Sequence, residues 1–143
     1  MASIQEKVVQ FRWTSEMVTL LLENIAAYKV DMEFKGLDFD ADRHLQYKYV
    51  RESLARKFSD NSNFFGVESM DRIDFSGKSE KEVRRMKKDI IYGMKRGYDR
   101  VLEKTKEICK TFSTAVTAGT RSGSGKIVYE NYDILVQIYG GSV

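Results

Sequence analysis

The sequence predicts an all-α fold. Proline is absent from its 143 residues, although average usage of about 5% would give roughly seven. Because proline interrupts helix interiors, such a chain can form long, unbroken helices. Strong helix formers such as Glu, Lys, Arg, Met and Leu are frequent, and apolar residues recur at spacings of three and four. With 42% hydrophobic residues, the chain can bury the core of one domain.

We expect the first helix at about residues 14–30. Thr14 or Ser15 supplies the N-cap oxygen, and Glu16 lies favourably near the positive end of the helix dipole. Trp13 precedes the cap and should fold back over the first turn. The inward side follows the helical spacing of Met17, Leu20, Leu21, Asn24, Ile25 and Tyr28. Residues 31–41 form an acidic connection whose expected core contacts are Phe34, Leu37 and Phe39.

The second helix is expected at about residues 42–58, capped by Asp40 or Asp42. Its inward candidates are Leu45, Tyr49, Leu54 and Phe58. Residues 59–78 are polar and rich in turn-forming residues, and this connection is long for a compact helical domain. Its phenylalanines predict that it is held against the core, through Phe64, Phe65 and Phe75.

The third helix begins after Ser79, which forms a capping-box pattern with Glu82. Its apolar period continues to about residue 119, a length of roughly 60 Å at about 1.5 Å per residue. Gly93 and Gly97 each cost a helix about 1 kcal/mol relative to alanine, which leaves a kink or break there as an alternative. Their Gly-x-x-x-Gly spacing indicates the close approach of another helix, since the surrounding bases exclude a membrane setting.

A flexible joint rich in glycine and serine is expected at residues 119–126, followed by a final helix at 127–139. That helix has a broad apolar surface and Gly140 as its C′ residue. A strand is the alternative for so short an apolar run. The predicted organisation is a leader at 1–10, a helical domain at 11–102 and a helical extension at 103–143.

The charges are segregated along the chain. Residues 78–106 contain eleven Lys or Arg against five Asp or Glu, whereas residues 1–77 contain ten against thirteen. On a helical wheel the apolar side of the third helix comprises Val83, Met86, Ile90, Met94, Val101, Ile108 and Phe112. The opposite side is basic and comprises Lys81, Arg84, Arg85, Lys88, Lys95, Arg96 and Lys106.

A solvated surface helix also turns charge outward, but such faces usually mix signs in i,i+4 pairs. Here acids are a minority, which favours a polyanionic partner and most simply nucleic acid. The wheel assigns Arg84, Arg85 and Lys88 to DNA contacts. Further phosphate contacts are expected from Lys81, Arg121 and Lys126.

Catalytic chemistry is not indicated. The lone histidine, His44, sits early in the second helix, where a solvated or capping role is favoured. The acids Asp38, Asp40 and Asp42 lack the rest of an EF-hand loop. The Gly123–Lys126 string fails the phosphate-binding-loop pattern, because Thr120 stands where glycine is needed and Ile127 where a hydroxyl is needed. We expect no enzyme activity, no cofactor and no metal.

The sequence contains no apolar run long enough for a membrane span and no signal-peptide pattern. We therefore expect an intracellular protein in a reducing compartment. The single cysteine, Cys109, excludes an intramolecular disulfide and lies beside the apolar stripe of the third helix. A buried structural thiol is favoured there.

Three segments resemble one known family. They are Trp13-Thr14-Ser15-Glu16 followed by Leu20, Leu21 and Leu22; residues 49–58; and residues 94–101. Together they resemble a Myb/SANT-like domain of the trihelix or transposon-derived kind. The resemblance implies a three-helix bundle, to which the apolar periodicity adds a long third helix and a C-terminal helix outside the Myb pattern. It also implies that Lys95, Arg96 and Arg100 match the family's basic cluster on the helix that enters the DNA major groove.

This resemblance implies double-stranded DNA as partner, a nuclear location and a role in transcription regulation. The alternative is a SANT-type protein-interaction module that binds a histone or another protein without binding DNA. In that alternative the helix at 127–139 forms a homodimer, or the acidic first half receives a basic peptide.

Overall fold

The computed structural model describes residues 10–59, 62–118 and 125–140. Within these ranges every regular element is helical, so the all-α prediction is confirmed and the strand alternative is wrong. The elements are α1 (Ser15–Phe34), α2 (Arg43–Lys57), the one-turn α3 (Ser62–Phe65), the 3-10 turn η2 (Met70–Arg72), α4 (Glu80–Ala118), α5 (Lys126–Glu130) and α6 (Tyr132–Tyr139).

The starts of the three main helices follow from their capping residues. The Thr14 side chain accepts a hydrogen bond from the Met17 amide at 3.1 Å. Asp42 accepts one from the Leu45 amide at 3.0 Å, and Ser79 accepts one from the Glu82 amide at 3.2 Å. Each oxygen satisfies an amide that has no partner within its helix. The predicted caps are confirmed.

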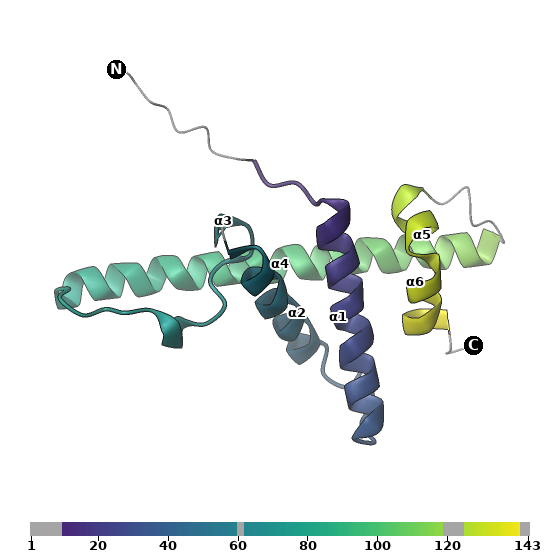
Figure 1. Cartoon of the computed structure of the whole chain (residues 1–143), viewed down its shortest axis with the longest axis horizontal. Coiled ribbons are helices and arrows are strands. Elements are labelled where there is room, and N and C mark those ends of the chain that lie inside the picture. The colour runs from purple at the N-terminus through teal and green to yellow at the C-terminus, as the bar shows by residue number, and fades with distance from the viewer. Residues whose placement is uncertain (1–9, 60–61, 119–124, 141–143) are drawn as a thin grey trace, which may run out of the picture.

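Helix α4 is the spine of the molecule (Figure 1). Helices α1 and α2 cross its middle, and α5 and α6 lie towards its C-terminal end. It runs unbroken for 39 residues, so the alternative of a break at Gly93 or Gly97 is wrong. Its N-terminal half extends beyond the bundle, beside the connection formed by residues 66–79.

The two glycines of α4 admit the close approach predicted for them. A Cβ atom on Gly97 would meet the Phe65 carbonyl and lie 2.6 Å from the Phe65 Cα. One turn earlier Gly93 faces Gly66, where an added Cβ would lie 2.7 Å from the Gly93 carbonyl carbon. Gly66 also has a φ of 78°, which favours glycine. The approaching helix is α3, with the residue that follows it.

The core lies where α1, α2, α5 and α6 meet the C-terminal half of α4. Its fully buried members are Phe65, Leu21, Leu22, Ile25, Leu54, Ile108, Leu135, Val50, Val101 and Val128. Phe39 packs against this core as expected. The prediction that Phe34 and Leu37 contact the core is wrong, because these side chains are 90% and 55% exposed. Helix α1 continues to Phe34, and its periodicity turns that side chain away from Leu21 and Ile25.

Helix α2 buries a different stripe from the one predicted. Leu45 and Tyr49 are 46% and 43% exposed, so these inward assignments are wrong, while Leu54 is confirmed. The buried side consists of Gln46, Tyr47, Val50, Arg51, Leu54 and Ala55. Leu45 and Tyr49 form one apolar stripe of four-residue spacing, and Val50 and Leu54 form another. The fold buries the second stripe together with Arg51, whose contacts are described below.

The prediction of a single helix at 127–139 is also wrong, because this segment forms two helices, α5 and α6. The break falls at Asn131, whose side-chain amide donates to the Ile127 carbonyl at 2.9 Å. Lys29 of α1 donates to the carbonyls of Gln137 and Ile138 at 3.1 and 2.7 Å, and so binds the C-terminal end of α6. In the described part of the chain no helix is long and apolar enough to cross a membrane.

Candidate nucleic-acid interface

The N-terminal half of α4 carries six exposed bases on one face. We call Lys81, Arg84, Arg85, Lys88, Lys95 and Arg96 the cationic face. At 100° per residue these six positions fall within an arc of about 120°. From Lys81 to Arg96 the face extends over roughly 23 Å, given a rise of about 1.5 Å per residue. The sequence prediction had placed all six on one side, and the structure leaves every one of them accessible.

No member of the cationic face forms an ion pair with another described residue. Lys81 and Arg85 are one turn apart, as are Arg84 and Lys88. Like charges at this spacing destabilise a helix by a few tenths of a kcal/mol per pair, about as much as opposite charges stabilise it. The face therefore carries positive charge that no ion pair within the described residues neutralises.

The opposite side of the same helical segment is packed. Val83, Met86, Ile90 and Met94 are partly buried, and α3 contacts α4 at Gly97. On the flank between the two sides, the Lys87 ammonium lies 5.5 Å from the centroid of the Phe75 ring in the connection. Because the packed side is occupied, the cationic face points away from the rest of the bundle.

Arg100, the last predicted DNA contact on α4, has a different environment. Its guanidinium donates to the Phe64 carbonyl at 2.6 Å and lies 4.1 Å from the centroid of the Phe11 ring. Burial lowers the pKa of this guanidinium. These contacts hold α3 and the segment before α1 against α4, so the structure gives Arg100 a packing role.

Of the two predicted phosphate contacts in the joint, only Lys126 is described by the structure, and it is not part of the cationic face. Lys126 begins α5, near the other end of α4 from the cationic face (Figure 1), and its ammonium lies 3.8 Å from the Glu130 carboxylate. Arg121 lies outside the described residues. The structure thus brings together six of the nine bases that the sequence pattern selected.

Two exposed apolar side chains within the basic segment were not predicted from the sequence. Tyr92 is 60% exposed and Ile91 is 57% exposed. Tyr92 is one turn after Lys88 and one turn before Arg96, so the helical wheel would have placed it within the cationic face. A pattern of charge alone does not single it out.

A buried arginine secures the connection that leads into α4. Arg51 is 2% exposed and donates to the carbonyls of Phe65, Val67 and Glu68 at 3.0, 2.7 and 3.0 Å. The Glu68 carboxylate also pairs with Arg56 at 2.6 Å and Arg72 at 3.1 Å. The hydrogen bond from Arg56 lowers the pKa of Glu68. These contacts hold α2 against the connection formed by residues 66–79, which runs beside the N-terminal half of α4.

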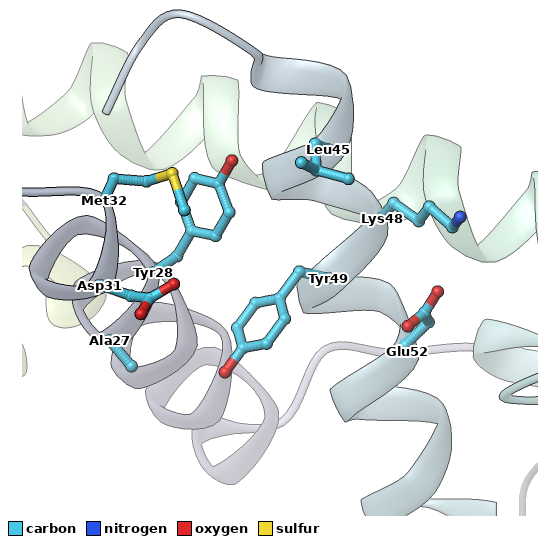
Figure 2. Close-up of a pocket in the computed structure, with 8 residues that line it drawn as sticks. All are labelled: Ala27, Tyr28, Asp31, Met32, Leu45, Lys48, Tyr49 and Glu52. Carbon is cyan, nitrogen blue, oxygen red and sulfur yellow. The ribbon is translucent and has the colours of Figure 1, made fainter. Parts of the chain in front are cut away.

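A groove of about 350 Å³ lies between α1 and α2 (Figure 2). Its walls include the rings of Tyr28 and Tyr49, whose centroids are 5.9 Å apart. Asp31, Lys48 and Glu52 supply its charged groups. The groove contains neither histidine nor cysteine, and in the described ranges no three acids, histidines or cysteines are grouped for a metal ion.

The residues singled out for other chemistry have structural partners. His44 lies with its Nδ1 atom 2.9 Å from the Tyr98 hydroxyl. The Asp38 carboxylate accepts a bond from the Asp40 amide at 3.0 Å, and Asp42 caps α2. Cys109 is partly buried beside the core. Local hydrogen bonding at the start of α2 therefore accounts for the acids Asp38 and Asp42.

Comparison with known proteins adds no assignment. No family model matches the chain, and no match is found among curated proteins or solved structures.

Proposed function

We propose that this chain is a DNA-binding module that places the cationic face of α4 in the major groove. The observation that carries the proposal is the set of six exposed, unpaired bases on the side of α4 that faces away from the bundle. A helix with its side chains is about 10–12 Å wide, and the major groove is about 12 Å wide. The N-terminal half of α4, which carries the cationic face, extends beyond α1 and α2 (Figure 1). Those two helices therefore leave room for the duplex.

In this proposal α1, α2 and α4 correspond to the three helices of a Myb/SANT-like domain, and the chain acts in the nucleus as a non-enzymatic regulator of transcription. What supports the correspondence is the sequence resemblance, together with three main helices of which the last is the longest. Arg100 then braces the recognition helix from behind, through Phe64, while the cationic face makes the contacts. The described residues of α5 and α6 pack near the other end of α4 and leave this face uncovered.

Fluorescence anisotropy with a labelled 20-base-pair duplex tests the proposal. Six phosphate contacts predict that binding weakens by roughly 10³-fold between about 50 and 200 mM salt. The variant K88E/K95E/R96E should lose binding at moderate salt. The matched control R12E/K57E/K110E makes the same change in net charge at exposed positions outside the cationic face, and should keep most of the affinity. Equal affinities for the two folded variants would refute the proposal.

A second candidate function is supported by exposed apolar residues at the α1–α2 end. Val30, Phe34, Leu37, Leu45 and Tyr49 are all more than 40% exposed. Leu45 and Tyr49 line the groove of Figure 2, and Val30 and Phe34 line a neighbouring hollow of about 450 Å³ between α1 and α6. Residues 31–42 contain five acids and one base, so the chemistry fits a basic, partly apolar peptide such as a histone segment.

This candidate is tested with a labelled peptide that has the sequence of residues 80–97, used as a basic amphipathic probe. Saturable binding that is lost in Phe34→Glu but kept in Val116→Glu, a control at an exposed position of α4, would support it. Absence of binding would refute it. Dimerisation through residues 127–139 stays a prediction, and Val128, Leu135 and Ile138 are already buried within the chain. Sedimentation that gives a monomer at all concentrations would refute this prediction.

A further inference from the structure

We propose that Tyr92 reads thymine, by placing its ring against the C5-methyl group on the floor of the major groove. This inference rests on the proposed DNA binding and names the base contact that the cationic face makes. It follows from where Tyr92 lies on α4, from its exposure, and from the chemistry of the groove.

Tyr92 occupies the midline of the cationic face. At 100° per residue, Arg84 and Lys95 fall on one flank of this face, and Arg85 and Arg96 fall on the other. Between the two flanks lie Lys81, Lys88 and Tyr92. When such a helix enters a groove, its flanks face the two phosphate backbones and its midline faces the base edges, while a long lysine side chain on the midline can still reach a phosphate. Tyr92 is therefore the aromatic side chain directed at the bases.

The ring of Tyr92 has no partner in the described part of the protein that would account for its position. It is 60% exposed, and none of the aromatic contacts of the fold includes it. The hydroxyl of an exposed tyrosine can donate to a phosphate, whereas its ring gains free energy when its apolar surface is covered. Tyrosine also loses little conformational freedom on binding, because it has only two side-chain torsions.

The major groove offers one apolar group that differs between bases, the methyl group of thymine. Adenine, guanine and cytosine present hydrogen-bond donors and acceptors there. Lys88, one turn before Tyr92, can contact the acceptors of guanine or a phosphate, whereas the Tyr92 ring cannot replace a charged donor. Because the Tyr92 ring lies one turn from Lys88 on the midline, it should select a thymine close to the base pair or phosphate that Lys88 contacts.

The test adds or removes a single methyl group in the DNA. Anisotropy is measured with four 20-base-pair duplexes: alternating dA·dT, the same duplex with deoxyuridine in place of thymidine, alternating dG·dC, and the same duplex with 5-methylcytosine. The wild-type protein should lose about fourfold in affinity when thymine loses its methyl group, the factor for one buried methylene-sized group. It should gain a similar factor when cytosine acquires one.

Variants assign the effect to the ring. Tyr92→Ala should bind the methylated and unmethylated duplexes equally, with an unchanged salt slope because no phosphate contact is lost. Tyr92→Phe should keep the methyl preference, since it keeps the ring. Ile91→Ala, at the adjacent exposed position, is the matched control and should also keep it.

The outcomes separate this inference from the proposed function. If the wild-type protein binds all four duplexes with one affinity, DNA binding stands and the thymine contact is refuted. The contact is likewise refuted if Tyr92→Ala keeps the preference or if the preference is lost in Ile91→Ala alone. If the wild-type protein binds none of the duplexes even at low salt, the proposed function and this inference both fail.

Discussion

Two glycines one turn apart in α4 should respond to alanine with opposite signs. A Cβ atom on Gly97 would overlap the Phe65 backbone, with 2.6 Å to the Phe65 Cα. A Cβ atom on Gly93 would meet only the Gly66 Cα, at 3.7 Å, which is an ordinary van der Waals distance. Both substitutions improve the intrinsic helix propensity of α4 by the same amount, so the local contact decides the difference.

The magnitudes follow from that comparison. Alanine at Gly93 should stabilise the fold by up to about 1 kcal/mol, the difference in helix propensity between the two residues. At Gly97 the same gain is outweighed, because overpacking typically costs about 1–3 kcal/mol and a backbone atom cannot rotate away as a side chain can. The shift of α3 would also strain the bond from Arg51 to the Phe65 carbonyl. We expect a net destabilisation of about 2 kcal/mol.

Urea denaturation of both variants, followed by far-ultraviolet circular dichroism, measures the two free energies of unfolding. With an m-value of about 2 kcal/mol/M, the two midpoints should differ by more than about 1 M, in opposite directions from the wild type. Stabilisation by Gly97→Ala equal to that by Gly93→Ala would refute the contact between α3 and α4. It would also leave the Gly-x-x-x-Gly spacing without a physical cause in the fold.

Three further predictions concern the support of the interface and the core. Arg51→Met should destabilise the fold by about 3 kcal/mol or more, because three carbonyls lose their donor. Arg51→Lys should recover only part of that stability, since an ammonium lacks the guanidinium fork. Full stability in the Met variant would contradict this prediction. Thr105→Val should stabilise by about 1 kcal/mol in the same urea assay, because the buried Thr105 hydroxyl has no hydrogen-bond partner among the described residues; a loss of stability would indicate a partner. Burial raises the pKa of Tyr139 far above its ordinary value of 10.0, so the unfolded chain loses the Tyr139 proton at a lower pH than the folded chain. The free energy of unfolding should therefore keep its full value below about pH 10 and fall as the pH rises further. Tyr139→Phe should reduce that alkaline loss in a stability–pH profile, and an unchanged profile would refute the assignment.

The helix starts could be predicted from the sequence because their signals are local. Thr14, Asp42 and Ser79 each act on an amide three residues away, so no knowledge of the tertiary structure is needed. The buried face of α2 could not be predicted in the same way. Leu45 and Tyr49 form an apolar stripe as regular as that of Val50 and Leu54, and the choice between them depends on α1, α4 and the carbonyls that Arg51 binds.

The sequence likewise predicted one uniform apolar stripe along α4, from Val83 to Phe112, whereas the structure divides it. Val101, Ile108 and Phe112 are fully or almost fully buried, because α1, α2, α5 and α6 cover the C-terminal half of the helix. Val83 and Met86 are only partly buried beside the connection. Periodicity identifies the side that packs, but the number of elements available to cover it decides how far along the helix the packing extends.

The same division changes what the charge of residues 78–106 means for DNA binding. Arg100 and Lys104 belong to the packed half: Arg100 binds the Phe64 carbonyl, and the Lys104 side chain is only 11% exposed and pairs with Glu107. A count of all eleven bases in the segment would predict a log–log salt slope of about −10, whereas the six of the cationic face predict about −5. A measured slope close to −5, reduced by about 3 in K88E/K95E/R96E, would assign binding to this face. A slope near −10 would mean that bases outside the cationic face also contact DNA, and the proposed docking of α4 alone would then be wrong.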